Sequence, residues 1–95
     1  MGKTVENRAL KARIELPEPF TGADYLHHQR AFREADEAVR GFAAMLAVVE
    51  RGTYQAGGVE HDLKAEGLDA PLAVLLWASE VVIGVINACA VAEKN

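Results

Sequence analysis

The sequence contains a single cysteine, Cys89, among its 95 residues. One cysteine cannot form a disulfide within the chain, so cysteine usage does not point to an oxidising compartment. Residues 1–20 are polar and carry charges of both signs, and they lack the apolar core of a secretory signal. We therefore expect a cytoplasmic protein.

Positive charge is also scarce. The chain has 10 Lys and Arg against 14 Asp and Glu, which gives a formal net charge of −4. A surface that binds a nucleic-acid backbone needs clustered Lys and Arg side chains, and no such stripe is found in this sequence. We expect no nucleic-acid partner.

Motifs of catalysis and cofactor binding are missing as well. Ser79 is the only serine, and it lies in an apolar segment without a nucleophile turn, so we expect its hydroxyl to bond the carbonyl oxygen four residues back. Cys89 has no neighbouring histidine. His27 and His28 have no Asp, Glu or His three or four residues further on, and the run Glu60–Asp62 is typical of a solvated segment. We expect no enzyme activity, no cofactor and no metal site.

Apolar residues, by contrast, are abundant. They make up 51% of the chain, which excludes disorder and is generous for a monomer of this length. We expect one domain over residues 1–95, with a small core and surplus apolar surface that a second copy or another protein covers. A homo-oligomer is the simplest outcome.

Region 3–16 shows the alternation of a strand with one wet face. Leu10, Ala12, Ile14 and Leu16 face one way and charged residues face the other. A strand needs a partner, which is either residues 3–8, across a turn at Glu6-Asn7, or a strand of another chain.

A long amphipathic helix is expected over residues 22–51. Thr21 and Asp24 form the pattern of a capping box at its start, and Arg51-Gly52 is suited to its end. Its apolar positions follow a heptad, with two columns formed by Tyr25, Phe32, Val39 and Leu46 and by His28, Ala35, Phe42 and Val49. Residues 52–69, which contain Gly57-Gly58 and Gly67, are expected to form a loop.

A second helix is expected over residues 70–92, and it is apolar almost all round. Glu80, Gly84 and Asn87 interrupt it on one side. The segment is long enough to cross a bilayer. Glu80 near the centre of the segment opposes insertion into a membrane by roughly 2.5–3.5 kcal/mol, so we expect protein to cover this helix. A membrane-anchored accessory protein is the alternative.

Together these segments predict a mainly α (α+β) fold. It consists of a short N-terminal β-strand or hairpin followed by a long antiparallel two-helix hairpin, packed into an oligomeric helical bundle. Glu80 and Asn87 are expected at the rim of this bundle or paired across subunits, because an unpaired buried carboxylate is costly.

The order of segments resembles a known family. Leu-Pro-Glu-Pro-Phe-Thr at 16–21 leads into the first helix, and Pro-Leu-x-x-Leu-Leu-Trp at 71–77 opens the apolar one. In this the chain resembles the small tail assembly chaperones of long-tailed bacteriophages and prophages. The resemblance implies a helical, self-associating protein that binds the tape-measure protein and keeps it soluble while tail-tube subunits assemble. It implies no enzyme activity and no cofactor.

The expected function is therefore protein binding. An apolar client helix can lie against the exposed side of residues 72–91 or along the heptad groove. The predicted anchors are Phe42, Leu76, Trp77 and Ile83. A self-associating structural or regulatory module with an unknown partner is the alternative within the class of binding proteins.

Overall fold

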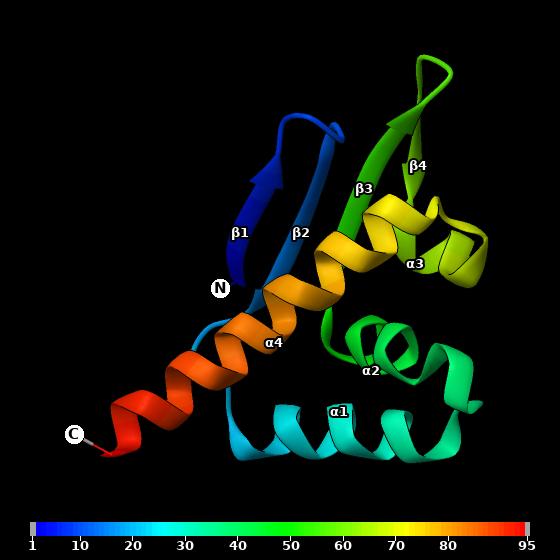
Figure 1. Cartoon of the computed structure of the whole chain (residues 1–95). Coiled ribbons are helices and arrows are strands. Elements are labelled where there is room, and N and C mark those ends of the chain that lie inside the picture. Colours follow the sequence, from blue (N-terminus) through cyan, green and yellow to red (C-terminus); the bar gives the residue numbers. More distant parts are fainter. Residues whose placement is uncertain (1, 95) are drawn as a thin grey trace.

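The computed structural model describes residues 2–94, with side chains for residues 2–90. Within this range four strands form one antiparallel sheet in the order β1-β2-β3-β4 (Figure 1). The strands are β1 (Gly2–Asn7), β2 (Ala12–Pro17), β3 (Arg51–Ala56) and β4 (Val59–Asp62). The helices α1 (Gly22–Glu34) and α2 (Arg40–Val48) come between β2 and β3, whereas α3 (Leu63–Glu66) and α4 (Leu72–Lys94) follow β4.

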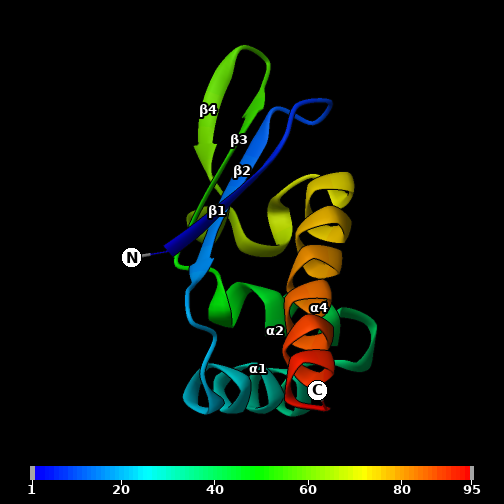
Figure 2. The same ribbon diagram turned by 90° about the vertical axis from the view of Figure 1, so that its left-hand side faces the viewer.

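This α+β architecture contradicts the predicted fold, in which a short N-terminal strand or hairpin precedes a long antiparallel two-helix hairpin. α4 packs against the sheet and α2 instead of pairing with one long helix. Figure 2 shows the sheet on one side of the molecule, α4 on the other, and α2 between the sheet and α1. The sheet supplies apolar surface that, in the predicted bundle, other subunits were expected to supply.

The alternation of β2 has the predicted consequence. Ala12, Ile14 and Leu16 are all buried, because β2 is a central strand with one face turned toward α2 and α4. β1 pairs with β2 in an N-terminal hairpin, with Val5 opposite Ile14. The turn of this hairpin lies at residues 8–11 and not at Glu6-Asn7.

The predicted helix 22–51 is in fact two helices. The capping box forms as expected, with the Asp24 amide donating to the Thr21 hydroxyl oxygen. α1 then ends at Glu34, and a 3₁₀ turn, η1 (Glu37–Val39), leads into α2. The Arg40 side chain donates to the Ala35 carbonyl oxygen at 3.4 Å, which holds this bend. Folding back lets the apolar α2 pack between the sheet and the more polar α1, which a straight helix does not allow.

The predicted loop 52–69 is also wrong. β3 and β4 form a hairpin through Gly57 and Gly58, whose φ angles of 60° and 75° are those of a tight type I′ turn. Arg51-Gly52 begins β3 and does not end a helix. Gly52 is required by close packing, since a Cβ there meets the Leu63 side chain at 2.9 Å.

α4 lies close to the predicted range 70–92 and crosses the inner face of the sheet. Its inward side chains join β2, β3 and α2 in one core. The buried members of that core with the largest side chains are Ile14, Leu16, Met45, Leu63, Val49 and Val82. The outer face of the sheet carries the polar side chains of each strand and no helix covers it within the described residues (Figure 2).

Candidate protein-binding face on the last helix

The four predicted anchors do not lie on one surface. Phe42 and Trp77 are half-buried and pack against the core, so they hold the fold together. Leu76 and Ile83, on α4, are 48% and 46% exposed. The structure therefore retains two of the predicted anchors as exposed surface residues, whereas the other two are half-buried against the core.

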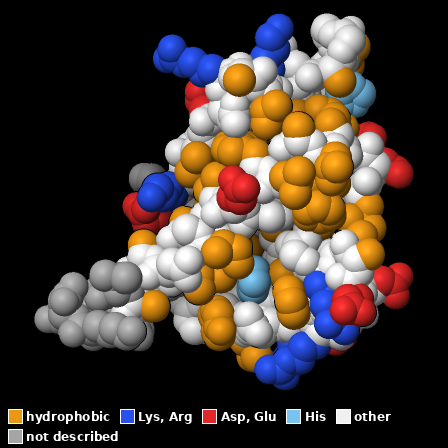
Figure 3. Space-filling model, in the orientation of Figure 1, with side chains coloured by type: hydrophobic (Ala, Val, Ile, Leu, Met, Phe, Trp, Pro, Cys, Tyr) orange, Lys and Arg blue, Asp and Glu red, His pale blue; other side chains and the backbone are white. Residues whose placement is uncertain are grey.

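Leu76 and Ile83 belong to an apolar line along the outer side of α4. Leu72, 60% exposed, lies one turn before Leu76, and Ile83 lies two turns after it, so the three side chains share one helix face. Figure 3 shows hydrophobic side chains gathered over α4 on the side turned away from the sheet. Large exposed apolar side chains in a contiguous patch mark interaction sites more often than isolated ones do.

A shallow groove runs beside this line, and we call it the α4 groove. It is lined by Leu76, Ser79, Glu80, Ile83, Gly84 and Asn87. Gly84 keeps its floor open, since a Cβ added there meets no atom within 4 Å. Its walls are mostly apolar, which suits a helix side chain.

Three polar groups interrupt the α4 groove. Glu80 is the only charged residue between Leu72 and Ala90. Asn87 follows two turns later on the same side. The Ser79 hydroxyl oxygen is buried and has no hydrogen-bond partner among the residues that the structure describes, so the expected bond to the carbonyl four residues back is not formed. The i, i+4, i+7 spacing of Glu80, Gly84 and Asn87 was visible in the sequence as an interruption, but not as part of a binding groove.

The length of α4 is also compatible with a membrane span. Residues Leu72–Ala90 are long and apolar enough to cross a membrane, and 22% of this stretch is buried in the protein. Most residues of this stretch are therefore not fully buried by the rest of the described chain.

The predicted heptad columns are only partly buried. Tyr25 and Phe32 on α1 are exposed, and the Arg40 guanidinium lies over the Phe32 ring at 5.9 Å from its centroid. His28, in contrast, is 4% exposed and is a core histidine, as its place on the heptad face suggested. Burial lowers the pKa of His28, so the neutral imidazole is the form that the fold accommodates.

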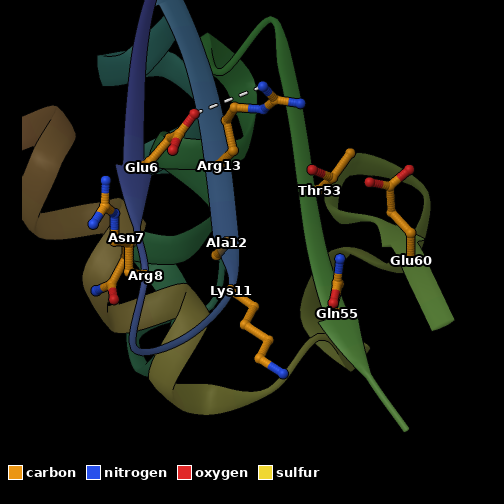
Figure 4. A pocket seen from close by; sticks show the side chains of 9 residues that line it. All are labelled: Glu6, Asn7, Arg8, Lys11, Ala12, Arg13, Thr53, Gln55 and Glu60. Carbon is orange, nitrogen blue, oxygen red and sulfur yellow. Dashed lines mark ion pairs between the residues drawn. The ribbon is translucent and has the colours of Figure 1, made fainter. Parts of the chain in front are cut away.

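The outer face of the sheet carries a polar hollow (Figure 4). Its charged residues have both signs, and Arg13 pairs with Glu6 across β1 and β2 at 3.7 Å. Arg8 and Lys11 line the same hollow, and Glu60 is its second acidic residue.

Tyr54 and His61 stack across β3 and β4, with ring centroids 5.1 Å apart. Burial, followed by the nearby Glu66 and Asp69 carboxylates, raises the pKa of the Tyr54 phenol. Within the described residues, no group of three or more His, Cys, Asp or Glu side chains is placed to hold a metal ion. The Tyr54–His61 stack joins β3 to β4.

The α4 groove and its apolar line are thus the best candidate for a functional surface. Protein-family models, curated proteins and solved structures offer no match to this chain.

Proposed function

We propose that this protein is a non-catalytic binding protein that holds an apolar helical segment of another protein against the outer face of α4. The observation that carries the proposal is the line of exposed side chains at Leu72, Leu76 and Ile83. Leaving them in water forgoes roughly 1–2 kcal/mol per side chain of burial free energy. A partner that covers them recovers this energy.

The geometry favours a helix as the bound element. Anchors four and seven residues apart form a ridge that follows the axis of α4, and the α4 groove runs parallel to it. A second amphipathic helix presents side chains with the same spacing, so its ridge can fit into this groove.

The client that best fits the resemblance is the tape-measure protein of a long-tailed phage or prophage, with tail-tube proteins as further partners. Its long apolar helices need protection from water before the tail tube surrounds them. Of the two segments that carry the resemblance, 16–21 covers the end of β2 and the linker to α1, and 71–77 covers the start of α4. The proposed location is the cytoplasm, where tails assemble, and self-association of the chain in the absence of client is part of the proposal.

Co-expression with the tape-measure protein from the same genome tests this function. Wild-type protein is expected to keep the tape-measure protein soluble, and the double variant Leu76→Gln/Ile83→Gln is expected to lose this effect. The matched control is Val59→Gln/Leu68→Gln, which alters exposed apolar residues elsewhere and should retain it. Equal solubility with both variants, or a genome without a tape-measure gene, contradicts the proposal, provided that circular dichroism shows both variants folded.

Membrane association is the second candidate, and the length and exposure of α4 favour it. In that case the apolar line faces lipid. Flotation with phosphatidylcholine vesicles separates the two candidates: the protein-binding proposal predicts that the chain remains at the bottom of the gradient, and comigration with the vesicles favours the membrane candidate.

A further inference from the structure

Glu80 lies in the middle of the apolar face that is proposed to bind a helix. In the helix its neighbours along this face are Leu76, one turn before, and Ile83, one turn after. Among the described residues, no side chain forms an ion pair or a hydrogen bond with its carboxylate. A partner helix that covers Leu76 and Ile83 also removes water from Glu80, and burial of an unpaired carboxylate is strongly unfavourable.

The groove around Glu80 offers acceptors to a cation. The Asn87 side chain lines the same groove and can present its amide oxygen. Arginine has five N–H donors and no acceptor, and lysine has three donors. The apolar walls suit the methylene stem of such a side chain, and the absence of a Cβ at Gly84 leaves space for it.

The chemistry of α4 itself argues against a second copy as the preferred occupant. Between Leu72 and Ala90 the helix carries no Lys or Arg. Two α4 faces packed together therefore bury two Glu80 carboxylates and supply no cation. Lipid chains supply no donor either.

From this charge complementarity we infer that the α4 groove selects apolar helices that carry one Arg or Lys in the middle of their seam, with Glu80 as the residue that determines specificity. This inference rests on the proposed helix-binding function and adds to it the chemistry of the partner. The cation pairs with Glu80 and Asn87, while the apolar residues on either side of it cover Leu76 and Ile83.

Two synthetic helical peptides with the same leucine seam, differing only in a central Arg or Leu, serve as probes. Wild-type protein is expected to bind the Arg peptide about 10- to 100-fold more tightly, the range of a charge-assisted hydrogen bond. Glu80→Gln keeps the side-chain shape and should abolish the preference. Glu60→Gln removes the same charge from an exposed position on β4 and should preserve it. Fluorescence anisotropy of labelled peptides measures each affinity.

The possible results distinguish failure of this inference from failure of the helix-binding function on which it rests. Equal affinities of wild-type protein for the two peptides overturn the selection of a cation and leave helix binding intact. Equal loss of preference in Glu60→Gln and Glu80→Gln also overturns it, since general charge attraction then explains the preference. Binding of neither peptide contradicts both proposals. A wild-type dimer in sedimentation that Ile83→Gln dissociates and that excludes both peptides assigns the face to a second copy and contradicts the inference.

Discussion

Leu75 and Leu76 provide the sharpest test of how α4 is oriented. The two residues are adjacent and identical in type, but Leu75 is 3% exposed and Leu76 is 48% exposed. Leu75→Ala leaves a cavity between α4 and the rest of the core, and it is expected to lower the free energy of unfolding by about 2–5 kcal/mol. Leu76→Ala removes a side chain that is half in water and places a better helix former there, so its cost is expected to be below about 1 kcal/mol.

Urea denaturation followed by circular dichroism measures the difference. With a denaturant dependence of about 1–2 kcal/mol per M for a small domain, Leu75→Ala is expected to shift the unfolding midpoint by more than about 1 M. Leu76→Ala should shift it by a few tenths of that amount. If Leu76→Ala costs as much as Leu75→Ala, the outer face of α4 is covered in solution and the reasoning about a free binding face is refuted.

Three further substitutions test other parts of the structure. Gly58→Ala forces a Cβ into a left-handed conformation at φ 75° and should destabilise the β3–β4 hairpin by about 1 kcal/mol in urea denaturation, whereas an unchanged midpoint contradicts the type I′ turn. Because burial lowers the pKa of His28, the unfolded chain binds more protons than the folded one, so stability is highest above about pH 6.5 and falls as pH decreases from there toward the lower folded pKa. This slope should vanish in His28→Gln and persist in His27→Gln. Ser79→Ala removes a hydroxyl without a partner and should raise the thermal midpoint or leave it unchanged, and a loss of more than about 1 kcal/mol shows that the hydroxyl is bonded in solution.

Local patterns in the sequence predicted those elements that depend on a few neighbouring residues. The alternation of Ala12, Ile14 and Leu16 identified the central strand, because only one of its faces meets the core. The Thr21–Asp24 capping box likewise placed the start of α1, since the cap depends on residues three positions apart. The apolar run of α4 also predicted a helix, because that pattern too is formed by neighbouring residues.

The remaining elements depended on contacts distant in sequence. The heptad over 25–49 conceals the bend at residues 35–39, which is favoured because α2 gains burial against the sheet. Gly57-Gly58 is a hairpin signal, but one of the two buried residues of β3 is Gly52, which leaves no mark in a hydrophobic pattern, and β4 is short with every residue at least partly exposed. β1 and β4 are edge strands with few buried side chains, and such strands leave little trace in a hydrophobic pattern.

The candidate site was predictable only in part for a related reason. An apolar helix shows that its whole circumference avoids water, but not which arc the rest of the chain covers. The sheet decides that Leu75 is core and Leu76 is surface, and it places Trp77 against the core. Glu80 was visible in the sequence as an exception in an apolar helix. Its place among exposed apolar anchors follows from the packing of α4 on the sheet.

Site-specific photocrosslinking tests the central claim most directly. A benzophenone amino acid placed at Leu76, on the outer face of α4, is compared with the same residue at Val59, an exposed apolar position on β4. With the tape-measure protein of the same genome co-expressed, helix binding by α4 predicts a crosslinked adduct from position 76 and none from position 59. Adducts from position 59 alone, equal adducts from both positions, or none from either contradict it.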